Sequence, residues 1–536
     1  MSSNPKAPES TGASSPSASE TIDAPRGVLI VDLGTQYAQL IARRVREARV
    51  WCEIAPPHKA LELAAKMDLA GVILSGGPAS VYAKDAPVVP KELLELGVPV
   101  LGICYGMQWM CQALGGHVEA ASEREFGRAS IRVENPAGVL DAIDGHTVVW
   151  MSHGDQVTTL PKGFEVFAST ETCPFAVVGD PARGFFGLQF HPEVTHSVRG
   201  REMLENFLVR VCEAPAVWRP DSIVERQVEK VRDIVGTDGE VVLGLSGGVD
   251  SSVAAMILHE AIGDRLHCVF VDNGLLRHGE REAVETLFGG HFHLDLTVVD
   301  AREEFLAALA GIDDPEAKRK VIGKVFVDVF KREAKRFQNA GFLGQGTLYP
   351  DVIESVAAHG GNTAVIKSHH NVGGLPADLG MQLVEPLREL FKDEVREIGR
   401  HLGLASVVVD RQPFPGPGLA VRILGDITEE KCALLRRADH IVTSEIEKAG
   451  AHVGLWQYFA VLLPTKSVGV MGDQRTYENA CCLRIVSSED AMTADWAYLD
   501  QALLARISNR IINEVRGINR VVLDITSKPP GTIEWE

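Results

Sequence analysis

The sequence predicts an α/β protein in which two doubly wound parallel-sheet domains are followed by a small α+β domain. Short apolar runs alternate with helical patterns over residues 27–214 and again over 219–414, as in a parallel sheet covered by helices on both faces. From residue 415 to 536, alternating apolar residues predict a smaller antiparallel or mixed sheet with two helical stretches. A length of 536 residues suits about three to four domains.

Composition narrows the class of protein. Hydrophobic residues make up 45% and charged residues 23% of the chain, which is typical of globular proteins. The net charge of −19 argues against a broad surface for nucleic acid or membrane, so neither partner is expected. The nine Cys residues are scattered without a Cys-x-x-Cys pair, which favours a reducing cytoplasm over a disulfide framework or structural zinc. Residues 1–26 are rich in Ser, Pro and Ala, and we expect a disordered tail there.

The strongest single motif lies between an apolar run at 241–245 and a helical pattern at 253–262. A strand, a turn of small residues and a helix start form an anion site, because glycines let backbone N–H groups approach phosphate and the helix N-terminus is electropositive. We expect ATP phosphates there, with Asp250 also a candidate Mg²⁺ ligand. The candidate ATP-binding residues of this loop are Ser246, Gly247, Gly248, Val249, Asp250, Ser251 and Ser252. The motif resembles the PP-loop of ATP pyrophosphatases and lacks the Gly-Lys-Ser/Thr of a Walker loop.

The first domain contains a candidate nucleophile. Predicted strands at 28–33, 70–74 and 99–103 precede small-residue turns, and Cys104 follows the third strand between two glycines. Such a sharp strand-to-helix turn exposes a side chain, and a helix N-terminus favours thiolate over thiol. The alternative for Cys104 is a small buried thiol that only fills space.

A general base follows the end of a later predicted strand. His191 and Glu193 are two residues apart in extended chain, so their side chains point to one face. Glu193 can orient the His191 ring, and His191 can deprotonate Cys104 and later protonate a leaving amine. The backbone N–H groups of Gly77 and Tyr105 are candidates for an oxyanion hole.

At these residues the chain resembles the class I glutamine amidotransferases. The match runs through 76–78, 102–108 and 190–193, and 151–155 fits the family's glutamine pocket. The resemblance implies hydrolysis of glutamine to glutamate and ammonia through a thioester on Cys104. The remaining cysteines of this domain lack such a context and are expected to be packing residues; they are Cys52, Cys111, Cys173 and Cys212.

Four further positions in the ATP domain, which follows a linker near 215–220, each carry two open interpretations. Each residue is a ligand for nucleoside, phosphate or metal, or else an ordinary turn or surface residue. They are Asp272 (nucleoside, or a turn cap), Asp351 (metal or substrate, or an Asx turn), Lys367 (phosphate, or a solvated loop) and Arg319 (substrate phosphate, or an exposed helix face).

The middle and C-terminal parts narrow the resemblance to the family of glutamine-hydrolysing GMP synthases. The matching stretches are 345–355, 367–376, 385–388, 414–419 and the tail 526–536; Gln412 departs from the His expected before Pro413. The resemblance implies that Lys528 and Glu534 of the tail bind the XMP nucleotide, that Arg475 joins them, and that the C-terminal domain forms a homodimer. It also implies Mg²⁺ with ATP as the cofactor.

The implied reaction converts XMP, ATP, glutamine and water into GMP, AMP, pyrophosphate and glutamate through adenyl-XMP. Two rivals remain open from the residues alone: another PP-loop amidation or tRNA-thiolating enzyme, and a catalytically dead sensor of glutamine or ATP. Thiolation would favour a basic RNA surface and a sulfur-relay cysteine, whereas the net charge is −19 and Cys268 is the only Cys of the ATP domain. A sensor would not need Cys104, His191 and Glu193 together.

Overall fold

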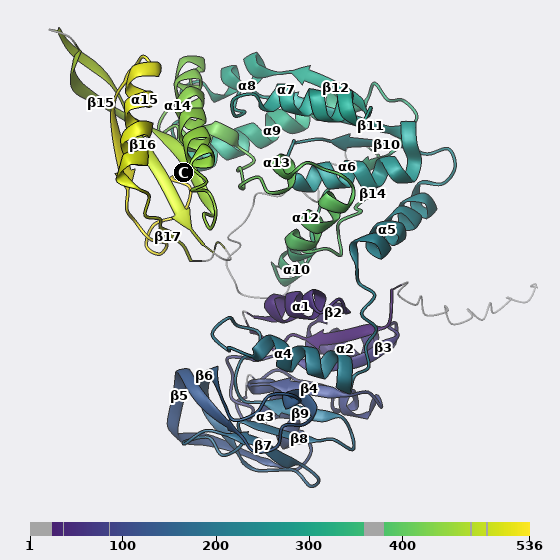
Figure 1. The fold of residues 1–536 in the computed structure, drawn as a ribbon. Coiled ribbons are helices and arrows are strands. Elements are labelled where there is room, and N and C mark those ends of the chain that lie inside the picture. The colour runs from purple at the N-terminus through teal and green to yellow at the C-terminus, as the bar shows by residue number, and fades with distance from the viewer. Residues whose placement is uncertain are drawn as a thin grey trace, which may run out of the picture. The chain divides into compact units, whose positions relative to one another are not determined.

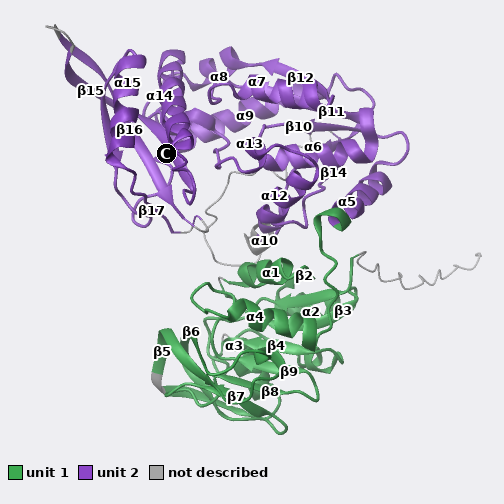
Figure 2. Cartoon of the chain, viewed as in Figure 1, with its two compact units in different colours: residues 1–222 green, residues 223–536 purple. Residues whose placement is uncertain are grey.

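The computed structural model describes residues 24–35, 37–84, 86–358, 380–471, 474–488, 491 and 493–536. The chain forms two compact units, residues 1–222 and 223–536 (Figure 2). No helix among the described residues is both long enough and apolar enough to cross a membrane.

The first unit is built on a sheet to which its described residues contribute nine strands in the order β2-β1-β3-β4-β9-β8-β7-β5-β6. Strands β2, β1, β3, β4 and β9 run parallel, and the strands beyond them pair antiparallel. The strands are β1 (Gly27–Val31), β2 (Trp51–Ala55), β3 (Leu69–Leu74), β4 (Val100–Ile103), β5 (His117–Val133), β6 (His146–Thr159), β7 (Glu165–Ser169), β8 (Val177–Asp180) and β9 (Phe185–Leu188). The helices are α1 (Ala38–Glu47), α2 (Pro57–Ala64), α3 (Tyr105–Ala113), α4 (Gly200–Glu205) and the short η1 (Lys91–Glu95), η2 (Gly138–Leu140) and η3 (Asn206–Val211).

In the parallel half of this sheet, β1, β3 and β4 were predicted because they are buried apolar runs, whereas β2, which contains Glu53, was not. Every residue of β1 and β4 is buried, as expected for strands covered on both faces. The antiparallel half was not predicted. Over its first eight residues β6 alternates buried with exposed or partly exposed residues, which is the pattern of a strand with one solvated face.

The second unit begins with a parallel sheet of five described strands in the order β12-β11-β10-β13-β14 (Figure 1). The strand predicted before the phosphate loop is confirmed as β10. The elements are α5 (Pro220–Val235), which spans the boundary between units, then β10 (Glu240–Gly244), α6 (Val249–Ile262), η4 (Gly263–Arg265), β11 (Leu266–Asp272), α7 (Glu280–Val284), η5 (Glu285–His291), β12 (Asp295–Asp300), α8 (Arg302–Leu309), α9 (Pro315–Ala334), β13 (Ala340–Gly344), α10 (Tyr349–Ala358), β14 (Gln382–Val384), α12 (Lys392–His401), α13 (Ser406–Val409) and η6 (Gly418–Arg422).

The C-terminal part of this unit carries a small mixed sheet. Strand β16 pairs antiparallel with β15 and β17 and parallel with β18. The elements are α14 (Glu429–Lys448), β15 (Gln457–Met471), β16 (Gln474–Ser487), β17 (Asp495–Trp496), α15 (Gln501–Glu514) and β18 (Ile518–Asp524). β15 is one long strand, whose register with β16 shifts between Leu462 and Lys466.

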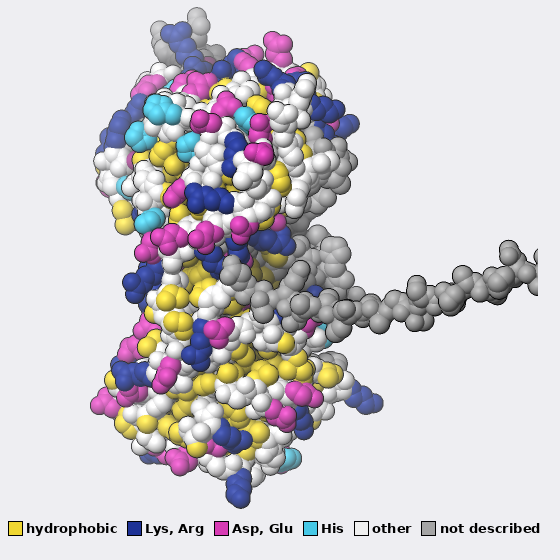
Figure 3. Space-filling model, turned by 90° about the vertical axis from the view of Figure 1, so that its right-hand side faces the viewer, with side chains coloured by type: hydrophobic (Ala, Val, Ile, Leu, Met, Phe, Trp, Pro, Cys, Tyr) yellow, Lys and Arg dark blue, Asp and Glu magenta, His cyan; other side chains and the backbone are white. Residues whose placement is uncertain are grey.

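The two parts of the second unit share a hydrophobic core. One cluster of buried residues includes Val242 and Val269 of the parallel sheet, Leu435 of α14, and Leu483 and Ile518 of the small sheet. A domain boundary at residue 414 therefore remains a prediction. On the face shown in Figure 3, acidic and basic side chains are interspersed.

Candidate active sites

Cys104 lies at a sharp turn between β4 and α3. It is the residue before the helix, with φ of 50° and ψ of −106°. A positive φ is strained for any residue with a Cβ and costs on the order of 1–3 kcal/mol, so surrounding structure must hold it. The Cys104 N–H donates to Leu188 O at 2.7 Å, and a Cβ added to Gly102 or Gly106 would lie within 2.6 Å of Met107 or Leu74 backbone atoms. The sharp strand-to-helix turn predicted from sequence is therefore present, but the Cys104 side chain is buried, with 5% of the residue exposed.

His191 and Glu193 form a buried pair beside this elbow. His191 Nδ1 and Glu193 Oε1 are 2.8 Å apart, and the Glu193 side chain is fully buried. Burial lowers the pKa of His191, but hydrogen bonds with Cys104 and Glu193 outweigh it and raise the pKa to about 10. The geometry thus favours an imidazolium held between a thiol or thiolate and a carboxylate.

The glycines after β3 leave room for this pair. A Cβ on Gly76 would lie 2.9 Å from His191 Cε1 and 3.8 Å from Cys104 Cβ, and one on Gly77 would lie 2.6 Å from Leu33 O. Tyr105 is the first residue of α3, so its N–H has no partner four residues back within the helix. Both features suit the predicted oxyanion role of Gly77 and Tyr105, which remains a prediction.

The segment predicted to bind glutamine lies next to the nucleophile. Cys104 Sγ is 3.7 Å from Ser152 O, and Gln108 Nε2 donates to Asp155 O at 2.8 Å. His153 is buried, with Nε2 3.1 Å from Glu125 Oε2 and Nδ1 3.1 Å from Asp155 O. Burial lowers the pKa of His153, opposed by its contacts with Glu125.

Cys173 belongs to a cluster that sequence reasoning missed. Ligand atoms of Glu125, His153 and Cys173 lie within 4.8 Å of one another, so the three groups could hold a metal ion. The Glu125 carboxylate already accepts from Thr170 Oγ1 at 2.8 Å and contacts His153. A hydrogen-bonded network that fixes the His153 ring accounts for these contacts.

The predicted phosphate loop has the expected strand–turn–helix form. Gly247 has φ of 74°, and a Cβ there would lie 2.9 Å from Val284 Cγ2. Ser246 Oγ and Ser251 Oγ are 2.9 Å apart, and Ser252 Oγ donates to Gly248 O at 2.7 Å. These bonds hold the turn open at the N-terminus of α6.

Asp250 fits the requirements of a metal ligand. Its Oδ2 accepts from Lys392 Nζ at 2.7 Å, whereas its Oδ1 is buried with no hydrogen-bond partner among the described residues. A buried oxygen without a partner is costly unless a ligand satisfies it. Thr347 Oγ1 is likewise buried without a described partner, and a Cβ on the adjacent Gly346 would be 3.3 Å from the Asp250 carbonyl carbon.

The other acidic candidates make local contacts. Asp272 Oδ1 accepts from Gly274 N at 3.0 Å, and its Oδ2 lies 3.4 Å from Arg281 Nη1. Asp351 Oδ2 accepts from Leu348 N at 3.1 Å at the start of α10. Both side chains thus support turns, as one of the two interpretations expected, and their ligand roles remain predictions.

The C-terminal tail is held by three buried cations that the sequence argument missed. Arg422 binds the Glu534 carboxylate through two hydrogen bonds of 2.7 and 3.0 Å, and Lys318 pairs with Glu536. Arg484 donates to Thr526 O at 2.6 Å and Thr532 O at 2.9 Å. The side chains of the three cations are fully buried, so the tail is an integral part of the unit. Each of these cations is far in sequence from its partner in the tail, so no local sequence pattern indicates the contact.

The remaining predicted residues are dispersed. Lys528 Nζ donates to Ala491 O at 2.8 Å, Arg319 on α9 lies 3.8 Å from Glu316, and Arg475 on β16 is exposed. Lys367 lies outside the described residues. Gln412 donates to Tyr458 O at 3.0 Å and accepts from Tyr458 N at 2.9 Å, so the amide exchanges two hydrogen bonds with one residue of β15.

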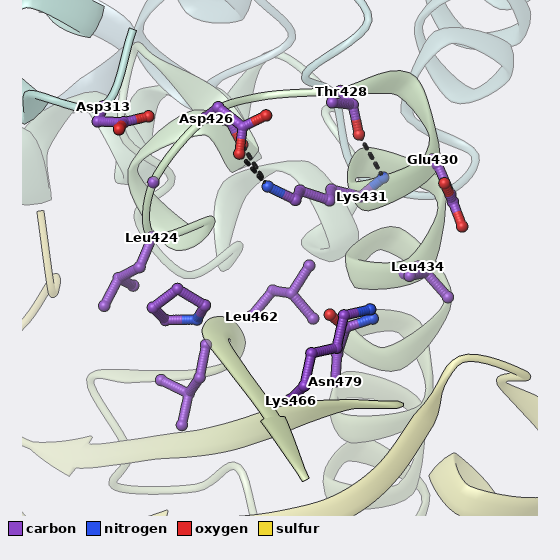
Figure 4. A pocket seen from close by; sticks show the side chains of 13 residues that line it. Asp313, Leu424, Asp426, Thr428, Glu430, Lys431, Leu434, Leu462, Lys466 and Asn479 are labelled. Carbon is purple, nitrogen blue, oxygen red and sulfur yellow. Dashed lines mark hydrogen bonds and ion pairs between the residues drawn. The ribbon is translucent and has the colours of Figure 1, made fainter. Parts of the chain in front are cut away.

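A pocket of about 440 Å³ opens in the C-terminal part (Figure 4). Its wall includes the first turn of α14, where Thr428 accepts from Lys431 N at 3.2 Å, and the Lys431 side chain bonds to Asp426 O at 3.0 Å. Lys466 and Asp313 add opposite charges. Lys431 is already paired with Asp426, and Glu430 also lines the pocket, so Lys466 is the one remaining basic side chain of the lining against two acidic ones.

Comparisons with known proteins cover almost the whole chain. Residues 29–211 match the family model for glutamine amidotransferase class-I, 223–285 match NAD synthase, and 444–535 match the GMP synthase C terminal domain. The glutamine-hydrolyzing GMP synthase of Brachyspira hyodysenteriae is 56% identical over 95% of this chain and 99% of its own. The corresponding enzyme of Phenylobacterium zucineum is 58% identical over 95% and 98%, and that of Nitrobacter hamburgensis 54% over the full length of both. The chain therefore belongs to the family of glutamine-hydrolysing GMP synthases.

Proposed function

We propose that the two units divide the family's reaction, with glutamine hydrolysis at Cys104 in the first and amination of XMP in the second. The enzyme is a ligase that uses glutamine as the amido donor and ATP as the activating nucleotide. The observation that supports this division most is the assembly of Cys104, His191 and Glu193 at the carboxyl ends of the paired strands β4 and β9.

In the first unit, the Cys104 thiolate attacks the carboxamide carbon of glutamine. The N–H groups of Gly77 and Tyr105 stabilise the oxyanion, and His191 transfers a proton to the departing ammonia. Water then cleaves the thioester to give glutamate, with His191 as the base. Glu193 holds the ring and stabilises its charged form, as the short contact with His191 Nδ1 indicates.

In the second unit, the phosphate loop binds ATP. An oxygen of the XMP base attacks the α-phosphorus, pyrophosphate leaves, and ammonia then displaces AMP to give GMP. Mg²⁺ would neutralise phosphate charge, with Asp250 Oδ1 as its ligand from the loop. Lys367, Asp272 and Asp351 are proposed as further contacts to phosphate, nucleoside and metal, and Lys528, Glu534, Arg319 and Arg475 as contacts to XMP.

We also propose that the enzyme is a homodimer through its C-terminal part. Val468, Val470 and Tyr477 on the β15–β16 hairpin are 50%, 73% and 63% exposed, an apolar surface that a second copy would cover. An obligate interface buries on the order of 2,000 Å² or more. Sedimentation at micromolar concentration should give a dimer; a fully active monomer would contradict the proposal.

We expect the enzyme to work in the cytoplasm. All nine cysteines are unpaired and buried, which suits a reducing compartment.

A substrate-omission assay tests the function. The purified chain should form GMP only when XMP, ATP, a divalent cation and a nitrogen source are all present, with AMP formed in equal amount. Formation of AMP without aminated product from XMP would point to another adenylating enzyme.

A further inference from the structure

Arg277 is a buried cation beside the phosphate loop. It follows β11, and 11% of its side chain is exposed. Its Nε and Nη2 have no hydrogen-bond partner among the described residues, and the nearest carboxylate oxygen, of Asp439, is 4.0 Å away. That carboxylate already accepts from Ala460 N through its other oxygen. A guanidinium buried in this way costs stability unless a ligand binds it.

The neighbouring arginines already have carboxylate partners. Arg411 Nη2 lies 2.6 Å from Glu280 Oε1, and Arg422 binds Glu534 in a bidentate pair. Burial lowers the pKa of Arg277 to about 10, which still leaves it charged at neutral pH. Among the described residues, Arg277 is therefore the member of this group with no carboxylate oxygen closer than 4.0 Å.

Its position links the phosphate loop to the tail. The Arg277 N–H donates to Glu280 Oε2 at 2.9 Å, and Arg411, the partner of Glu280, also donates to Gly247 O at 3.3 Å. The Arg277 guanidinium lies 4.3 Å from the centre of the Phe414 ring. Arg422, which holds Glu534, lies 5.1 Å from the same ring.

We propose that Arg277 binds the anionic xanthine base of XMP at a carbonyl oxygen and is a specificity-determining residue of the amination site. The inference rests on the proposed function. Xanthine loses a ring proton near neutral pH, so its base carries charge on oxygen, and a planar guanidinium suits such an acceptor. A base lacking that oxygen leaves the cation unpaired and binds weakly.

The stability of the ligand-free chain separates a binding role from a structural one. Arg277→Met keeps a long side chain against Phe414 and removes the charge. Arg277→Lys keeps a positive charge but removes the planar guanidinium group. Arg436 is the matched control, because it contacts the same loop through hydrogen bonds to Leu276 O at 2.9 Å and Gly274 O at 2.6 Å. Arg436→Met should lower the unfolding midpoint, whereas Arg277→Met should leave it unchanged or raise it.

Kinetics with ammonia as the nitrogen source complete the test. Arg277→Met should raise KM for XMP about ten- to a hundredfold, as expected for a charge-assisted contact, with a much smaller change for ATP. Arg277→Lys should recover part of the loss. An unchanged KM for XMP in an active Arg277→Met variant overturns the inference, as does a selective rise of KM for ATP. Failure of the wild-type chain to aminate XMP would instead overturn the proposed function.

Discussion

The glutaminase site of the first unit and the amination site of the second are organised by different kinds of contact. In the first, the reactive groups touch one another: His191 bonds to Glu193 and Cys104, and both strands that carry the site end at the same sheet edge. In the second, Asp250 and Arg277 each retain buried atoms without a described partner. Glu193 Oε2 of the first site is also buried without a described partner, so what distinguishes the first site is the direct contact between its reactive groups.

Replacing the nucleophile should produce the largest difference between the sites. Cys104→Ala removes the sulfur needed for the thioester, so glutamine-dependent GMP formation should be abolished. Ammonia-dependent formation, measured at high ammonium and high pH, should persist because it needs only the second unit.

The control is Cys111→Ala, since Cys111 is a buried thiol of the same helix whose pKa burial raises to about 12. It should retain both activities. Equal loss of both activities in folded Cys104→Ala would contradict the assignment.

Removing residues 528–536 should disable the second site and leave the first chemically intact. The deletion takes away Lys528 and Glu534 and leaves Arg422 and Lys318 buried without their carboxylates, so GMP synthesis should be lost. Labelling of Cys104 by a glutamine-analogue electrophile should persist.

A single substitution separates binding by the tail from its structural role. Lys528→Met should raise KM for XMP roughly ten- to a hundredfold, which is the loss of affinity expected when one charge-assisted contact is removed. Lys431→Met, which removes the cation paired with Asp426, should not change it. XMP binding of normal strength by the truncated chain would show that the tail serves only as structure.

The protonation of His191 should make stability depend on pH. The pKa of His191 in the folded protein, about 10, exceeds the ordinary value of 6.5. Protonated His191 therefore stabilises the fold fully below pH 6.5, and this stabilisation is lost as pH rises through about 10. Glu193→Gln should weaken this dependence. It should reduce the difference in the free energy of unfolding between pH 6.5 and pH 10 by on the order of 2 kcal/mol. Thermal unfolding at both pH values measures this difference. The same dependence of stability on pH in the wild-type and Glu193→Gln proteins would contradict the charged pair.

The sequence allowed the glutaminase residues to be predicted because their signals are local. Cys104 stands at a strand end between glycines, and His191 and Glu193 share a face through a two-residue spacing. The parallel strands β1, β3, β4 and β10 were predictable for the same reason, since each contains a short apolar run, whereas β2 contains Glu53 and was not predicted. Asp351 also lies in a recognisable local pattern, but the same pattern is typical of a turn cap and of a metal ligand, so it does not distinguish the two roles.

The parts that escaped prediction depend on contacts between distant residues. Lys318 and Glu536 are separated by 218 positions and Arg422 and Glu534 by 112, so no spacing pattern marks them. In the sequence, Arg277 is one basic residue in a loop, and only burial beside Phe414 distinguishes it. The antiparallel strands β5 to β8 were not predicted, although β6 contains the apolar run from Val148 to Met151 and β8 contains Val177 and Val178.

The transfer of nitrogen from glutamine to the purine tests the central claim most directly. Glutamine with an isotopically labelled amide nitrogen would be supplied with XMP, ATP and unlabelled ammonium, and the GMP formed would be analysed by mass spectrometry. The wild-type chain should place the label in GMP, and Cys104→Ala should yield unlabelled GMP from ammonium. Unlabelled GMP from the wild-type chain, with glutamine hydrolysed, would show that the two sites do not act in sequence.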